Sequence, residues 1–141
     1  MEEIPTTAQI EASFPASAPG LGYALKEAES FCVARALPRD LVSRVLVVVE
    51  ELFTNVIKYG YGGDSERPVR LGISVVQLRV TVLLEDEAPP FDPTLFRRAS
   101  TERPDQGPEG LSGIALVLGL SARAEYQRLD TGNRLIVTVE T

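Results

Sequence analysis

The segment from Pro38 to Tyr59 constrains the fold most, because its apolar residues recur at the three- and four-residue spacing of a helix. On a wheel of roughly 100° per residue they fill one wide arc, so this helix must bury a broad face against another layer. Its valines are also typical of strands, but the length and the period favour a helix. The arc consists of Leu41, Val42, Val45, Leu46, Val48, Val49, Leu52, Phe53, Val56 and Ile57.

A polar stripe borders this arc. Glu51 and Asn55 are one helical turn apart, and Lys58 and Arg44 fall on the same flank. One interpretation is a solvated helix surface on which Glu51 pairs with Lys58 or Arg44. The other is a helix that lines a site with a carboxylate, an amide oxygen and a cation. The helix alone leaves both open.

Alternating apolar and polar residues predict the second layer. Residues 8–14 predict an N-terminal strand, and residues 69–75 and 80–84 predict a hairpin. Residues 124–140 predict a second hairpin around the turn at 130–133. Most of the strands in this chain are therefore expected to pair with a sequence neighbour.

The remaining segments complete the order of elements. Ser17 and Pro19 predict the start of a first helix that ends at Pro38. The polar residues 94–109 predict a long loop, and residues 112–120 a short helix. We therefore expect a single α+β domain over residues 1–141, a two-layer sandwich of a mixed, mostly antiparallel sheet with about three helices on one face.

Composition excludes several classes of protein. The chain has no histidine, so a histidine-based zinc site and a Ser-His-Asp triad are impossible. Cys32 is the only cysteine, which fits a reducing compartment. We expect a cytoplasmic protein, because no apolar run is long enough for a membrane span and the acidic N-terminus does not look like a secretion signal. A net charge of −6 does not indicate nucleic-acid binding, for which a basic surface is typical.

Two further motifs stand apart from core packing. Asp86 ends a strand and is followed by the turn Pro90-Phe91-Asp92-Pro93, and Gly110-Leu111-Ser112-Gly113 opens a helix. With EELFTNVIKYGY before them, these motifs resemble the ATP-binding domain of gyrase, Hsp90, histidine kinases and MutL, the GHKL or Bergerat fold. Within it, the chain most resembles the anti-sigma-factor serine kinases of bacterial partner-switching systems. The resemblance runs from about Ile10 to Val139.

The resemblance implies a role for each motif residue. The residue matching Asn55 binds Mg²⁺, for which an amide oxygen is a suitable hard ligand. The residue matching Glu51 acts as a general base or positions the attacking hydroxyl. Asp86 accepts a hydrogen bond from the adenine amino group, with turn capping as the alternative. Further ATP-binding residues implied are Lys58, Tyr59, Ala88, Phe91, Gly110, Leu111, Ser112 and Gly113, of which Phe91 also reads as core packing.

Three features leave alternatives open. The family usually has Asp-x-Gly-x-Gly, whereas Ala88 stands at the first glycine position, where a methyl group would lie beside the base. Gly110 and Gly113 either let backbone N–H groups approach phosphate or simply mark the start of a helix. Residues 94–109 are expected to form a lid, whose arginines either reach the γ-phosphate or are solvated. These arginines are Arg97, Arg98 and Arg103.

The resemblance implies an ATP- and Mg²⁺-dependent serine/threonine kinase that acts as an anti-sigma factor. Its expected partners are a sigma factor and a STAS-domain anti-anti-sigma protein, which it phosphorylates. A homodimer is also implied, with residues 8–14 and the first helix as its surface. The alternative function is a non-catalytic, nucleotide-responsive module that sequesters a sigma factor or another regulatory protein. Ala88 favours that alternative, whereas Glu51 and Asn55 oppose it.

Overall fold

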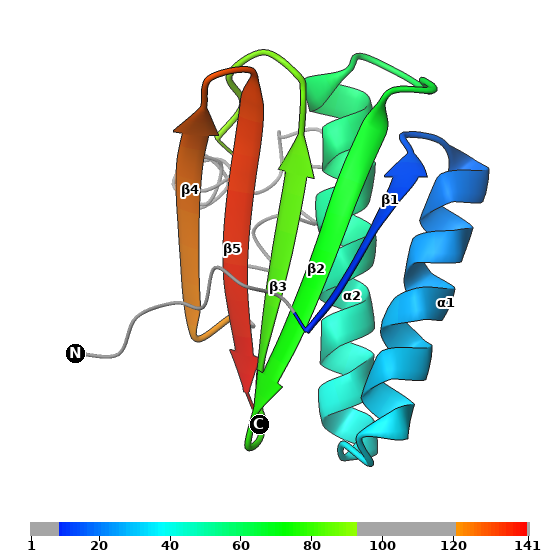
Figure 1. Ribbon diagram of the computed structural model, residues 1–141, viewed down its shortest axis with the longest axis vertical. Helices are drawn as coiled ribbons and strands as arrows, with labels where there is room; N and C mark the ends of the chain where they lie inside the picture. The colour runs from blue at the N-terminus through cyan, green and yellow to red at the C-terminus, as the bar shows by residue number, and fades with distance from the viewer. Residues whose placement is uncertain (1–8, 93–120, 141) are drawn as a thin grey trace, which may run out of the picture.

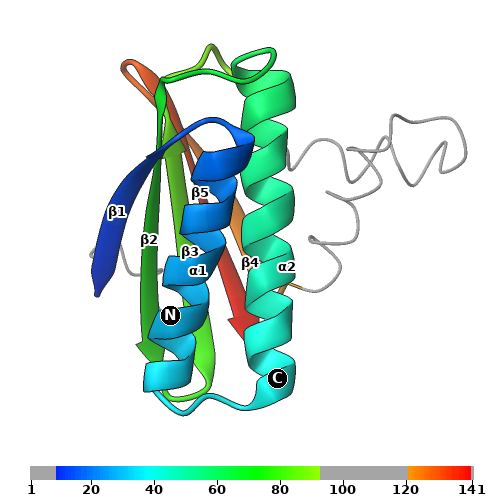
Figure 2. The same ribbon diagram turned by 90° about the vertical axis from the view of Figure 1, so that its right-hand side faces the viewer.

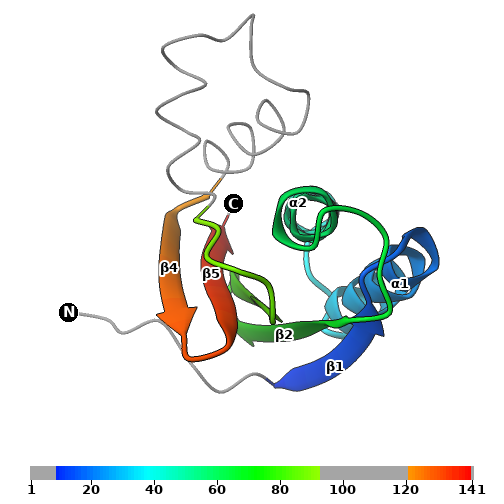
Figure 3. The same cartoon turned by 90° about the horizontal axis from the view of Figure 1, so that it is seen from above.

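The computed structural model describes residues 9–92 and 121–140. The helices and strands of this part form two layers, with α1 and α2 on the same face of the sheet (Figures 1, 2 and 3). The elements are β1 (Ile10–Pro15), α1 (Ala18–Ala34), α2 (Arg39–Asn55), the π-helical turn η1 (Val56–Gly60), β2 (Pro68–Val76), β3 (Arg79–Asp86), β4 (Arg123–Leu129) and β5 (Gly132–Glu140).

The sheet has the strand order β1-β2-β3-β5-β4. Every pairing in the described part is antiparallel, so the expected two-layer α+β fold is confirmed, without the parallel pairing that a mixed sheet would contain. Two α-helices lie in this part, fewer than the three expected; the helix expected at 112–120 lies outside it. The pairing of β3 with β5 joins the two hairpins and brings Asp86 opposite Asn133.

The first helix begins where the sequence predicts. The Ser17 hydroxyl caps it by accepting a hydrogen bond from the backbone N–H of Gly20 at 3.3 Å. A Cβ at Gly20 would lie 1.9 Å from the carbonyl oxygen of Pro15, so only glycine lets the helix start this close to the end of β1. This contact fixes α1 against the edge of the sheet.

The apolar arc of the second helix forms the centre of the core, as its period predicts. Leu41, Val45, Val48, Val49 and Phe53 are fully buried. They belong to one cluster with the inward residues of the sheet, each of which contributes about 1.5–3 kcal/mol when it is removed from water. These sheet residues are Val69, Leu71, Ile73, Val80, Val82, Leu84, Leu135, Val137 and Val139.

The expectation of one α-helix as far as Tyr59 was wrong in its last turn. The α-helix ends at Asn55, and Val56–Gly60 form a π-helical turn that closes with a 2.9 Å hydrogen bond from Tyr61 N–H to the Val56 carbonyl. Such turns occur frequently at functional sites. Neither α-helix in the described residues is long and apolar enough to cross a bilayer.

Candidate functional site

The end of α2 faces the end of β3 and the start of β5 across a small cavity. Three residues predicted for the site, Asn55, Asp86 and Phe91, line the same cavity. Its volume is about 20 Å³, which is room for roughly one water molecule. The other lining residues are Leu52, Val56, Leu84, Tyr126, Asn133 and Leu135.

Asn55 presents an unused acceptor to this cavity. The residue is 1% exposed, and its Nδ2 donates to the backbone carbonyl of Glu51 at 2.5 Å. Its Oδ1 is buried and accepts no hydrogen bond in the described part of the chain. A buried acceptor without a donor lowers stability by about 1–3 kcal/mol. Among the described residues, Asn55 Oδ1 is the buried side-chain atom that carries this cost.

The other members of the polar stripe lie outside the cavity lining. Glu51 is half-buried one turn before Asn55, and its backbone carbonyl holds the Asn55 amide. Lys58 is exposed on η1. Arg44 donates to the backbone carbonyl of Glu140 at 3.4 Å and is thereby tied to β5.

Tyr59 and Phe91 join the π-helical turn to the segment that follows β3. Their ring centroids are 5.8 Å apart and the planes are tilted by 32°. Aromatic pairs of this geometry contribute about 0.5–1.5 kcal/mol beyond the area that they bury. Phe91 is half-buried: it contacts the Tyr59 ring and also lines the cavity.

Asp86 has one engaged and one open carboxylate oxygen. Its Oδ1 accepts hydrogen bonds from the Ala88 backbone N–H and from Asn133 Nδ2, both at 2.8 Å, whereas Oδ2 accepts none from the described residues. Burial raises the pKa of this carboxyl group, and the two hydrogen bonds, with the nearby Arg128 and Arg67, partly oppose the rise. The turn cap, which was the alternative role for Asp86, exists on Oδ1, and Oδ2 accepts no hydrogen bond from the described residues.

Asn133 is a site residue that the sequence analysis missed. It is 4% exposed and lies at the centre of a network in which Nδ2 also donates to the carbonyls of Ala88 and Pro89, at 3.2 and 3.0 Å. Its Oδ1 accepts from the Phe91 N–H at 3.2 Å, from Arg128 Nη1 at 3.4 Å and from the Tyr126 hydroxyl. The sequence around Asn133 indicates only a hairpin. Its contact with Asp86 cannot be predicted from that pattern, because it depends on the pairing of β3 with β5.

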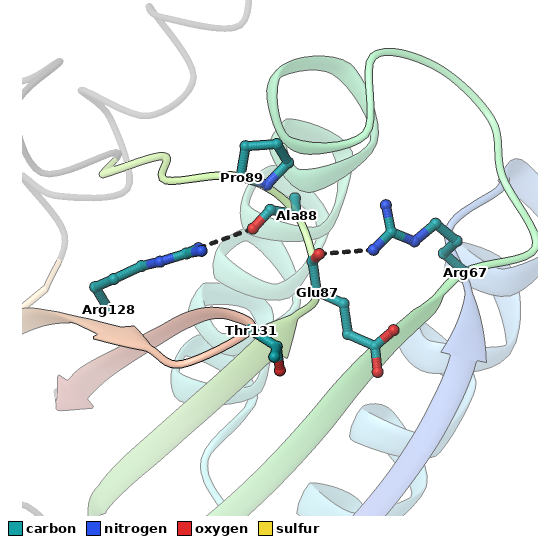
Figure 4. Close-up of a pocket in the computed structure, with 6 residues that line it drawn as sticks. All are labelled: Arg67, Glu87, Ala88, Pro89, Arg128 and Thr131. Carbon is teal, nitrogen blue, oxygen red and sulfur yellow. Dashed lines mark hydrogen bonds between the residues drawn. The ribbon is translucent and has the colours of Figure 1, made fainter.

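Side chains from two further elements hold the segment after Asp86. Tyr61 donates to the Pro68 carbonyl at 2.7 Å and accepts from the Glu87 N–H at 2.8 Å. Arg67 and Arg128 approach from opposite sides and donate to the carbonyls of Glu87 and Ala88, at 2.7 and 2.9 Å (Figure 4). The backbone of this proline-containing segment is thus bound by side chains where no strand can pair with it.

Ala88, which stands where the family usually has glycine, is accommodated by Gly60. Only Ala36 and Gln77 have a positive φ among the described non-glycine residues, so the backbone at Ala88 suits an alanine. A Cβ placed at Gly60 would lie 3.2 Å from the Ala88 methyl group. Ala88 is 1% exposed and lines the open hollow of Figure 4 instead of the cavity between Asn55 and Asp86.

Several predicted residues lie outside the described part of the chain. These are Gly110, Leu111, Ser112 and Gly113 of the glycine motif, and Arg97, Arg98 and Arg103 of the expected lid. In the part that is described, no three histidine, cysteine, aspartate or glutamate side chains gather into a group that could hold a metal ion.

The fold and the paired polar residues define a class of protein. Residues 14–139 match the histidine kinase-like ATPase domain, and the chain belongs to this family. The resemblance to the GHKL fold is thereby confirmed. Membership implies an ATP-binding site, and the cavity is lined by Asn55 and Asp86, two of the residues that the resemblance assigns to that site.

Solved structures share this fold at low sequence identity. One contains the RsbU and RsbW domains of Rv1364c from Mycobacterium tuberculosis, with a TM-score of 0.66, 12% identity, and coverage of 96% of this chain and 33% of the other. The present chain thus spans about a third of that protein. No curated protein matches the chain.

Two further structures are similar over nearly the whole of both chains. A chain of the SiaB-SiaC complex from Pseudomonas aeruginosa has a TM-score of 0.63 and 13% identity, with 94% of this chain and 89% of the other covered. The catalytic domain of histidine kinase ThkA has a TM-score of 0.53 and 14% identity, with 94% and 97% covered.

Proposed function

We propose that this protein is an ATP- and Mg²⁺-dependent serine/threonine protein kinase that acts as an anti-sigma factor. The observation that carries the proposal is the buried Asn55 Oδ1, which has no hydrogen-bond donor in the described residues and shares a cavity with Asp86. An ATPase-family domain with an unused hard oxygen ligand there is suited to metal-bound nucleotide.

Each residue has a defined task in this proposal. Asn55 Oδ1 would hold Mg²⁺, for which an amide oxygen is a suitable hard ligand. Bound ATP-Mg²⁺ supplies the phosphoryl group and much of the charge stabilisation. Glu51, one turn from Asn55, orients the substrate hydroxyl or accepts its proton. Asp86 Oδ2 accepts a hydrogen bond from the adenine amino group.

The cavity must enlarge before a base can enter, because about 20 Å³ holds little more than one water. Leu52, Leu84 and Leu135 on its wall belong to regular elements of the core. Phe91 follows β3 and is held through its backbone N–H and its contact with Tyr59. We infer that the Phe91 side of the cavity moves to admit adenine.

The proposed substrate is a serine or threonine of a STAS-domain anti-anti-sigma protein, and the second partner is a sigma factor. Likeness in fold to the RsbW-containing structure and to the SiaB-SiaC complex supports this assignment. We also propose a homodimer through β1 and α1, which sedimentation at micromolar concentration tests. The alternative is a nucleotide-responsive binding module without phosphoryl transfer, and Ala88, at the position where the family usually has glycine, is the residue that favours it.

Phosphoryl transfer from [γ-³²P]ATP to STAS-domain proteins of the same genome separates these functions. Glu51→Gln should keep ATP binding and lose transfer by about 10²–10⁴-fold, the range for one general base. Glu50→Gln is the matched control, because Glu50 is the exposed neighbour on the same helix. Binding of ATP without any transfer by the wild type would favour the binding module, and no binding at millimolar ATP would defeat both functions.

A further inference from the structure

We propose that Asn133 is the positioning residue for base recognition, which fixes Asp86 so that its open carboxylate oxygen meets the amino group of the base. This inference rests on the proposed nucleotide-binding function and adds a residue to it. Asn133 acts through Asp86 and through the backbone of residues 88–91, without itself needing to touch the nucleotide.

The hydrogen bonds of Asn133 allow only one orientation of its amide. All three partners of Nδ2 are acceptors: Asp86 Oδ1 and the carbonyls of Ala88 and Pro89. A flipped amide would place its oxygen against those three acceptors. The donors around Oδ1, from Phe91 N–H, Arg128 and Tyr126, would then face an NH₂ group. Both atoms of the Asn133 amide, Nδ2 and Oδ1, are therefore held in one orientation by their hydrogen bonds.

A locked Asn133 also fixes the direction of Asp86. Oδ1 is held by Asn133 Nδ2 and by the Ala88 N–H, so the carboxylate cannot rotate without breaking two hydrogen bonds in a buried place. Oδ2 is left as the acceptor that no described residue uses, on a side chain that lines the cavity. The locked pair offers an acceptor to the amino group of adenine, whereas the carbonyl at the same position of guanine would meet that acceptor with an oxygen.

The charge state of Asp86 depends on the same contact. Burial raises its pKa, and the hydrogen bond from Asn133 is the largest opposing effect. Arg128 on β4 and Arg67 before β2 also lower the pKa of Asp86. The pKa of the nearby Tyr61 is raised by burial and by the Asp86 carboxylate, and is lowered by the hydrogen bond that the Glu87 N–H donates to its hydroxyl. Loss of Asn133 should raise the Asp86 pKa further. A protonated Asp86 is a donor, which suits the guanine carbonyl.

Calorimetric titration with ATP and GTP between about pH 5 and 8 tests the role in recognition. Asn133→Ala should lower the ratio of ATP to GTP affinity by about tenfold, as for loss of one hydrogen bond to a charged group. The same variant should move the loss of ATP affinity on acidification to higher pH. Asn133→Ser, which keeps a hydroxyl donor, should restore part of both effects.

Thr131→Ala is the matched control, because Thr131 is exposed in the turn of the same hairpin, two residues before Asn133. It should leave the ATP-to-GTP ratio and its pH profile unchanged. A merely structural Asn133 would weaken both nucleotides by the same factor in the Ala and Ser variants and leave the pH profile in place, which would overturn the inference.

A second measurement needs no nucleotide. The carboxyl ¹³C shift of Asp86 in ligand-free protein should titrate at higher pH in Asn133→Ala, or in Asn133→Ser if the Ala variant does not fold, than in the wild type and Thr131→Ala. An Asp86 pKa that is the same in all of them would contradict the inference. If the wild type binds neither nucleotide, the proposed function fails, and this titration still decides whether Asn133 controls Asp86.

Discussion

Asn55 and Asp86 line one cavity from opposite layers, yet their surroundings differ. At the end of β3, Asp86 has two donors on Oδ1 and two arginines nearby, so one of its oxygens is satisfied by the chain itself. At the end of α2, Asn55 has a buried oxygen without a donor in the described residues. The strand end is therefore held by contacts within the chain, whereas in the proposed function the helix end gains its missing partner from bound Mg²⁺.

The largest effect that tests this contrast is on stability at the strand end. Asp86→Ala leaves the Ala88 N–H without its acceptor and removes one of the three acceptors of Asn133 Nδ2, so the free energy of unfolding should fall by about 2–4 kcal/mol. Urea denaturation measures the change. Asp64→Ala, at an exposed loop position, is the control and should change little. A loss below about 0.5 kcal/mol would mean that the network does not stabilise the fold.

The helix end should give the opposite result. Asn55→Ala removes the hydrogen bond to the Glu51 carbonyl and also the buried acceptor without a donor, so the two effects on unfolding free energy should cancel to within about 1 kcal/mol. ATP binding should lose its dependence on Mg²⁺ in calorimetry. Thr54→Ala, which loses a hydroxyl bond to backbone on the same turn, is the control and should keep that dependence. Retained Mg²⁺ dependence in Asn55→Ala would remove Asn55 from the metal site.

A smaller effect is expected in the pH dependence of stability. Because burial raises the Asp86 pKa above its ordinary value of 3.8, the folded state binds a proton more tightly than the unfolded state. This contribution to stability is fully present below the unfolded pKa and is lost as pH rises through the folded pKa. In urea denaturation, the wild type should lose stability relative to Asp86→Asn over that window. A constant difference would indicate an Asp86 pKa that folding does not change.

The contrast also explains how much of the site could be predicted. Asn55 and Asp86 occur in local motifs, a helix stripe and a strand end, and the apolar periods of the helix and the strand predict these two positions in the fold. Asn133 and Tyr61 act through partners far along the chain, since Asn133 meets Asp86 only because β5 pairs with β3. Gly132 belongs to the same group, because a Cβ there would lie 1.8 Å from the Asp86 carbonyl oxygen. Local patterns carry no information about such contacts.

The π-helical turn was missed for a similar reason. The period of the apolar residues continues through Val56 and Ile57, so the sequence predicts an unbroken helix. The turn depends instead on contacts of the next residue, Tyr61, whose hydroxyl donates to the Pro68 carbonyl and accepts from the Glu87 N–H. These tertiary contacts of Tyr61 hold the end of the helix beside the segment that follows Asp86.

The smallest effect is expected where the two ends touch, at Ala88 and Gly60. Ala88→Gly should change ATP affinity by less than about threefold and unfolding free energy by about 1 kcal/mol or less, because the methyl group faces Gly60 and not the cavity. Gly60→Ala should be destabilising in the wild type, where its Cβ would lie 3.2 Å from the Ala88 methyl, and less so in the Ala88→Gly background. Denaturation of the four proteins gives this coupling, and calorimetry gives the affinities. A tenfold gain in ATP affinity on Ala88→Gly would show instead that the alanine restricts the nucleotide site directly.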